Sequence, residues 1–196
     1  IEIFRKDLRW NIKENLAKEL KEKILKKPYR RGKYILIPTS KEHILLVHLG
    51  MSGTIKITSQ EYNVAKHDHV KISIETRDNK FFSIVYNDPR RFGYVDFFHS
   101  GKIKNHFLLK KLGVEPLEND FTMHYLQKKI YKKSKCVKNF LMDQSIIAGI
   151  GNIYASEILY RANINPLRAV DKLNKENLKS IIKATKFILK KSISVG

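Results

Sequence analysis

The hydrophobic pattern of this chain changes part-way along its length. In the first half, short apolar stretches alternate with polar residues, as at Val70, Ile72 and Ile74, and turn residues separate them. This spacing is typical of β-strands. Beyond the segment 113–117, apolar residues recur at helical spacing. The sequence therefore predicts an α+β chain with two domains, a β-sandwich or barrel followed by a helical domain.

The expected domains are a β-sandwich at 1–112, a linker at 113–120 that Pro116 stiffens, and a helical domain at 121–196. We expect helices at about 121–133, 137–146, 152–162 and 173–193. The segment 12–26 is either an amphipathic helix or a short helix with a charged tail. We expect strands at about 1–9, 34–37, 43–49, 54–58, 70–74, 81–86 and 92–98.

The chain is strongly basic, with a formal net charge of +20 from 39 Lys and Arg against 19 Asp and Glu. Such an excess favours a polyanionic partner, nucleic acid first and an anionic membrane surface second. No apolar run is long enough for a transmembrane helix. The single Cys136 excludes a disulfide framework and a Cys-rich zinc site within these residues, and it fits a reducing compartment.

A glycine-flanked turn precedes one predicted helix in the second half. Gly149, Ile150 and Gly151 are followed by Asn152, directly before a helical pattern. Glycines permit a turn with positive φ, and Asn is a common helix N-cap. The free N–H groups of such a helix start suit a phosphate. An ordinary corner between two helices fits this stretch equally well.

A cationic run lies before that turn. Runs of this kind are usually solvated helix faces, but the neighbouring turn favours contact with a DNA backbone. Its members are Lys128, Lys129, Lys132, Lys133, Lys135 and Lys138.

Two turns in the β-rich half carry apolar side chains where a core position is not expected. Met51 stands between Gly50 and Gly53, and an exposed Met on a basic protein suggests insertion into a base stack. Arg90 and Phe92 follow an Asp-Pro turn. Arg can take the place of an extruded base while Phe wedges beside it, although a core position for Phe92 fits equally well.

Other cations at strand ends are candidates for DNA contact. Lys33 follows two arginines at a strand entrance, where it is a phosphate contact, an acid/base group or simply part of a solvated strand end. His67 and His69 are too few for a metal site, so we expect His67 to donate to a phosphate or to lie on the surface.

Six segments in this order resemble the bacterial formamidopyrimidine-DNA glycosylases: RRGKYILI, VHLGMSG, KHDHV, DPRRFG, LGVEPL and LMDQSIIAGIGNIYASEIL. The resemblance implies a helix–two-turn–helix element around Asn152. It also implies a base-excision repair enzyme that removes oxidised purines such as 8-oxoguanine and formamidopyrimidines, then nicks the abasic strand by β,δ-elimination. The implied partner is double-stranded DNA with oxidised bases or abasic sites, bound by a monomer away from membranes. The implied location is cytoplasmic and nucleoid-associated.

The resemblance also implies residue roles. Lys33 matches the catalytic lysine that donates a proton during elimination. Met51, Arg90 and Phe92 match the residues that fill the gap left by the everted nucleotide. The residues implied in DNA binding are His48, His67, Arg90, Lys133, Lys138 and Asn152, and Glu157 matches a position near the lesion pocket.

Two departures from the family pattern concern the ends. The family nucleophile is an N-terminal proline amine followed by a catalytic Glu, whereas this sequence begins with Ile1 and Glu2. The family also continues into a lesion-binding loop and a zinc finger. We therefore expect a fragment that holds no cofactor and is inactive alone, from a parent that binds one zinc. The alternatives are a sister glycosylase for oxidised pyrimidines and a non-catalytic helix–two-turn–helix protein.

Overall fold

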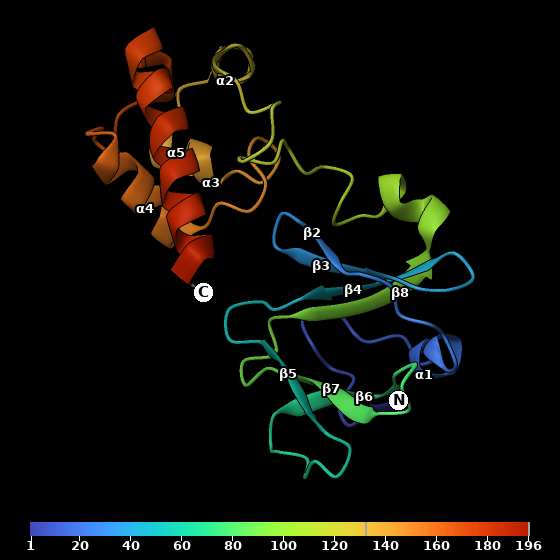
Figure 1. Ribbon diagram of the computed structural model, residues 1–196. Coiled ribbons are helices and arrows are strands. Elements are labelled where there is room, and N and C mark those ends of the chain that lie inside the picture. The colour runs from blue at the N-terminus through green and yellow to red at the C-terminus, as the bar shows by residue number, and fades with distance from the viewer. Residues whose placement is uncertain (132, 196) are drawn as a thin grey trace. The chain divides into compact units, whose positions relative to one another are not determined.

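The computed structural model describes residues 1–131 and 133–195 (Figure 1). Its contacts divide the chain into two compact units, Ile1–Lys104 and Asn105–Gly196. The first is built from strands and the second from helices, as the change in hydrophobic period predicts. Among the described residues, no helix is both long and apolar enough to cross a lipid bilayer.

The described part of the first unit contains two four-stranded antiparallel sheets, which lie as two layers in Figure 1. One sheet has the order β1 (Glu2–Ile3), β6 (Asp68–Glu75), β7 (Phe81–Asn87) and β5 (Thr54–Ser59). The other has the order β2 (Tyr29–Arg31), β3 (Tyr34–Pro38), β4 (His43–His48) and β8 (Tyr94–His99). The predicted sandwich is therefore confirmed.

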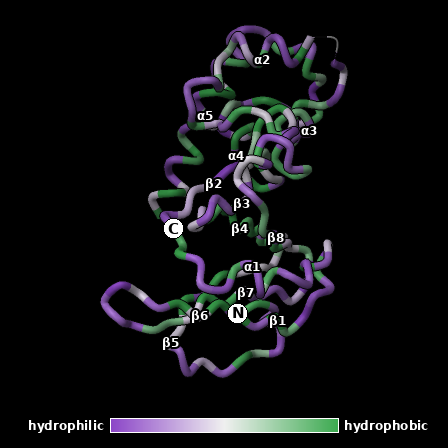
Figure 2. Tube along the Cα trace, turned by 90° about the vertical axis from the view of Figure 1, so that its right-hand side faces the viewer, coloured by the Kyte–Doolittle hydropathy of each residue, from purple (hydrophilic) through white to green (hydrophobic). Residues whose placement is uncertain are grey.

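The core of this unit lies between the sheets because strands alternate their side chains between two faces. Leu45 and Val47 of β4 pack in one buried cluster with Val70 and Ile72 of β6. Figure 2 shows hydrophobic stretches along these strands, while the connecting loops are mostly hydrophilic.

Of the two alternatives at 12–26, the helix over the whole segment is wrong, and the short helix with a charged tail is confirmed. Only α1 (Leu16–Leu20) is helical, and the side chain of Ile24 is 65% exposed. The helix ends because Glu22 adopts a left-handed conformation with φ of 56°. The chain beyond it pairs with the sheet edge, where Lys26 N donates to Pro38 O at 2.8 Å. Strand β2 follows and was missed, because two of its three residues are arginines.

The second unit packs α2 (Met123–Ile130), α3 (Val137–Met142), α4 (Asn152–Arg161) and α5 (Lys175–Val195) around one core. Short 3₁₀ segments lie at Ser100–Asn105 (η1) and Val170–Lys172 (η2). Leu126, Phe140, Ile158 and Ile181 supply one buried side chain from each helix.

Helices α2 and α3 are shorter than predicted. Helix α3 ends at Met142 because Asp143 accepts hydrogen bonds from the N–H and hydroxyl of Ser145, which start a turn instead.

Candidate nucleic-acid interface

The turn after β4 presents Met51 to solvent. Gly50 has a φ of 66°, and a Cβ there would lie 2.5 Å from the backbone carbon of Phe92. Gly53 N donates to Leu49 O at 2.8 Å and closes the turn. Only glycine fits position 50. The side chain of Met51, the next residue, is 72% exposed.

The turn after β7 lies against the Met51 turn. Arg91 N donates to Asp88 O at 3.1 Å, which makes a β-turn with Pro89 at its second position. The Arg90 guanidinium stacks over the Phe92 ring at 4.7 Å from its centroid. Phe92 is 41% exposed, so a core position for it is excluded. Met51, Arg90 and Phe92 are called the exposed trio below.

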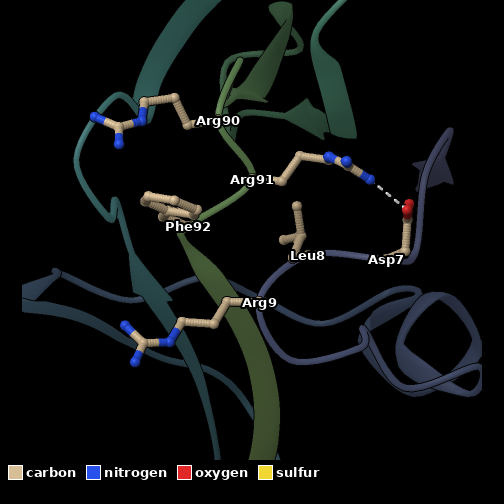
Figure 3. A pocket seen from close by; sticks show the side chains of 6 residues that line it. All are labelled: Asp7, Leu8, Arg9, Arg90, Arg91 and Phe92. Atoms are coloured by element: carbon tan, nitrogen blue, oxygen red, sulfur yellow. Dashed lines mark hydrogen bonds and ion pairs between the residues drawn. The ribbon is translucent and has the colours of Figure 1, made fainter.

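The two arginines of this turn point in different directions. They line, together with Asp7, Leu8, Arg9 and Phe92, a cavity of about 530 Å³. In Figure 3, Arg9, Arg90 and Phe92 project to the same side, whereas Arg91 reaches Asp7. The Arg91 ion pair with Asp7 is 2.5 Å long, and the Arg91 carbonyl accepts from Arg9 N at 2.8 Å. Arg91 therefore joins this turn to the segment 7–9, while Arg90 faces solvent.

Lys33 and His48 lie close enough to influence each other. Lys33 occupies the turn between β2 and β3, and loss of solvation lowers the pKa of its ammonium group. Burial lowers the pKa of His48, and the nearby charges of Lys33 and Arg9 lower it further. Gly50 N donates to His48 Nδ1 at 3.2 Å, so a neutral ring carries its proton on Nε2. That N–H is a suitable donor for a phosphate oxygen.

The two histidines at the start of β6 differ in their surroundings. His67 is half-buried, and its carbonyl accepts from Asp88 N at 3.0 Å, which places it beside the trio. His69 is buried and its Nε2 lies 2.7 Å from Asp88 O. Within residues 1–131 and 133–195, no three His, Cys, Asp or Glu side chains are arranged to hold a metal ion.

In the second unit, the glycine turn is fixed by one amide side chain. Gln144 Nε2 donates to Met142 O at 2.9 Å and to Ile150 O at 2.8 Å. Its Oε1 accepts from Gly149 N at 2.8 Å. Gly149 has the expected positive φ, at 89°. Sequence reasoning missed Gln144, although an amide five residues before a glycine turn can bond to the backbone of that turn.

The expected N-cap at Asn152 is wrong by one residue. Gly151 is the N-cap of α4 and Asn152 is its first helical residue. No side chain caps this end within the described part of the chain. Asn152 is exposed at this helix start, whose N–H groups have no side-chain cap.

The cationic run divides into different roles. Lys133 and Lys138 are both half-buried, in the loop before α3 and in α3 itself. Lys132 lies outside the described residues. Lys135 is paired with Asp143 at 2.6 Å and is thus already compensated. Glu157 is exposed on α4 and lines a cavity of about 560 Å³ with residues of α5, such as Phe187.

The Asp143 carboxylate is expected to stabilise the second unit in a pH-dependent way. Burial opposes its ionisation, but hydrogen bonds from Lys135 and Ser145 outweigh burial and lower its pKa from 3.8 to about 2. Because the folded pKa is the lower one, the stabilisation is present above about pH 4 and is lost as the pH falls towards 2. Asp143→Asn should cost about 1 kcal/mol at neutral pH and almost nothing near pH 2.

Urea unfolding followed by far-ultraviolet circular dichroism measures this cost. Asp120→Asn, an exposed carboxylate of the same unit, is the control and should change little. An Asp143→Asn cost that is constant from pH 7 to pH 2 would show that charge is not its cause.

Comparisons with known proteins agree with this arrangement. Residues 1–95 match the family model "Formamidopyrimidine-DNA glycosylase N-terminal domain", and residues 112–196 match "Formamidopyrimidine-DNA glycosylase H2TH domain". A formamidopyrimidine-DNA glycosylase of Rickettsia bellii is 37% identical over 196 residues, which cover all of this chain and 70% of that protein.

Solved structures of the Lactococcus lactis protein Fpg are also similar. A complex with abasic-site DNA has a TM-score of 0.84 at 32% identity, over 92% of this chain and 65% of that chain. A complex with Fapy-dG-containing DNA has a TM-score of 0.85 at 32% identity, over 93% and 67%. With both family models matched and a fold shared with these structures, the chain belongs to the formamidopyrimidine-DNA glycosylase family.

Proposed function

We propose that the whole protein is a base-excision repair enzyme that removes oxidised purines from double-stranded DNA. Its substrates would be 8-oxoguanine and formamidopyrimidines, and it would nick the resulting abasic strand by β,δ-elimination. The exposed trio carries this proposal, because two apolar side chains and a guanidinium stand in solvent on adjoining turns. Such side chains suit insertion beside an everted nucleotide. The similar Lactococcus lactis protein was solved with abasic-site and Fapy-dG DNA.

The other site residues have proposed roles in the same reaction. Lys33 is the proton donor for elimination, and its lowered pKa makes transfer easier near neutral pH. His48 and His67 bind phosphates beside the exposed trio. Asn152, with the N–H groups at the start of α4, binds a phosphate in the second unit, and Lys133 and Lys138 add charge.

A protein with this substrate works on the chromosome, so a location in the cytoplasm at the nucleoid is part of the proposal. A monomeric state is proposed as well. The single zinc of the full-length family has no ligand set in the described part of this chain, and no step here depends on it. The proposed nucleophile is an N-terminal proline amine. A secondary amine can attack the sugar and form an iminium that acts as an electron sink.

Borohydride trapping of the natural full-length protein tests the activity. Incubated with duplex DNA carrying 8-oxoguanine, the protein should form a covalent protein–DNA adduct and cleave the strand. Adducts only with an oxidised-pyrimidine duplex would favour the sister branch. No adduct and no cleavage with either duplex would contradict the enzyme assignment and favour a non-catalytic DNA-binding protein.

Lys133→Ala is expected to weaken binding to any DNA sequence. A lysine on a phosphate releases one counterion, so its loss should reduce the slope of log K against log salt by about 0.9. The control is Lys179→Ala in the same unit, because Lys179 is exposed and already paired with Glu176 at 2.8 Å. The measurement is a salt titration of duplex affinity by fluorescence anisotropy. A slope that Lys133→Ala leaves unchanged would remove Lys133 from the interface.

A further inference from the structure

Asp88 is a buried carboxylate at the base of the exposed trio. Its side chain has no solvent exposure, and the donors that reach it are neutral groups. Oδ1 accepts from Ser52 Oγ at 2.6 Å, and Oδ2 accepts from Tyr86 Oη at 3.0 Å and Gly93 N at 2.8 Å. Burial opposes ionisation of Asp88, but these donors keep its pKa below the ordinary value. The group is therefore charged inside the fold.

The donors come from two different turns. Ser52 belongs to the turn that carries Met51, while Gly93 ends the turn that carries the other two members of the trio. Ser52 Oγ also accepts from Arg90 N at 3.2 Å. The Arg90 backbone thus reaches the Asp88 carboxylate through the Ser52 hydroxyl, and its N–H also interacts with that carboxylate directly.

The backbones of the two turns are also closely packed beside these hydrogen bonds. A Cβ at Gly50 would lie 2.5 Å from Phe92 C, so the two turns touch main chain to main chain. A Cβ at Gly93 would lie 1.7 Å from Tyr86 Oη, the hydroxyl that donates to Asp88. The carbonyl of Asp88 accepts in addition from His69 Nε2. The carboxylate therefore bonds to both turns and to β7, and these segments are in direct contact.

Stability alone is a poor reason for such a group. A buried charge loses its hydration, and an apolar side chain of similar volume often stabilises a fold as well or better. What an apolar side chain cannot do is accept directional bonds from two turns at once. The buried carboxylate therefore fixes the relative position of the two turns, although it adds little to the stability of the fold.

We propose that Asp88, acting through Ser52, is a positioning residue that fixes the two turns against each other, so that the exposed trio enters DNA as a single unit. This inference rests on the proposed function, in which the trio replaces an everted nucleotide. Without the Ser52 link, the two turns would keep their backbone contact at Gly50 but lose hydrogen bonds that hold Arg90 at a fixed position relative to Met51. Each side chain would then lose conformational entropy when it inserts, a loss that the linked turns do not incur.

The test uses Ser52→Ala and Asp88→Asn in the 196-residue chain. Ser52→Thr keeps the hydroxyl and is the conservative variant. Ser83→Ala is the matched control, because the buried Ser83 hydroxyl has no hydrogen-bond partner among the described residues. A urea titration of Trp10 fluorescence selects conditions in which every variant is folded.

Two measurements are made under those conditions. Amide exchange of Arg90 by nuclear magnetic resonance should become about tenfold faster in Ser52→Ala and Asp88→Asn. The ratio of affinities for a duplex with a tetrahydrofuran abasic-site analogue and for an undamaged duplex should fall about fivefold in both. Ser52→Thr and Ser83→Ala should match the parent chain in both measurements.

Unchanged Arg90 exchange in Ser52→Ala would overturn the proposal. So would faster exchange with an unchanged affinity ratio, because the link would then have no effect on insertion. An equal loss of affinity for both duplexes would also count against it. If the unsubstituted 196-residue chain does not prefer the abasic-site analogue, the proposed insertion by the exposed trio fails for this chain, whereas borohydride trapping of the full-length protein decides the proposed function. The exchange rates then decide whether Asp88 and Ser52 join the turns.

Discussion

Gly50→Ala is expected to lower the free energy of unfolding of the first unit by about 3 kcal/mol. The added Cβ would meet Phe92 C at 2.5 Å and Gly93 N at 2.6 Å, and backbone atoms cannot move aside as a flexible side chain can. The φ of 66° adds the cost of a left-handed conformation for a residue with a Cβ. The same change separates the two turns that carry the exposed trio.

Urea unfolding of the chain measures this loss. Trp10 is the only tryptophan and stacks edge-on with Tyr94 at 5.3 Å, so its fluorescence reports on the first unit. Gly101→Ala is the matched control. Its Cβ would lie 3.2 Å from the His99 ring, an exposed side chain that can shift, and it should change stability by less than about 0.5 kcal/mol. Equal unfolding midpoints for the two variants would show that the turns do not press on each other.

Met51→Ala and Arg90→Lys are expected to impair lesion processing far more than DNA binding. Unstacking and everting a nucleotide costs a few kcal/mol, which the inserted side chains must offset. We therefore expect single-turnover base release by the full-length protein to fall about 100-fold for each variant. Affinity for undamaged duplex should change less than about twofold, because both variants keep the net charge.

Arg90→Lys retains the positive charge and removes the planar guanidinium that stacks on Phe92, so it separates shape from charge. Ile57→Ala controls for loss of an exposed apolar side chain, because Ile57 is 74% exposed on β5 of the same unit. If both rates and undamaged-DNA affinities fall together, these residues only contact the backbone.

The sequence was sufficient for the sandwich and the helices because their periodicity reflects burial. Val70 and Ile72 alternate as a strand with one face in the core requires, and both are buried. The same logic left two alternatives at 12–26, and periodicity could not choose the short helix over the long one. Ile12, Leu16 and Leu20 are buried as a helical pattern predicts, but Ile24 continues the pattern by chance and lies in solvent. Spacing cannot reveal where a chain leaves its helix to pair with a strand.

The candidate site divides in the same way. Turn chemistry indicated Met51, since a side chain at a glycine-flanked turn does not easily reach the core. It did not distinguish Arg90 from Arg91, because the difference depends on Asp7, which lies far away in the sequence. Ser52, Asp88 and Gln144 were missed for a similar reason. Their bonds to carbonyls, amides and hydroxyls depend on the folded path of the backbone.

The Gln144 side chain has a consequence for the phosphate site that we propose at the start of α4. Its three hydrogen bonds fix the backbone on both sides of Gly149 before any ligand arrives. Glycine backbones lose more conformational entropy on ordering than any other residue. Here that loss is incurred when the protein folds, so a phosphate bound at the proposed site would not have to incur it again. A flexible glycine sequence would thereby serve the proposed site as a preorganised receptor.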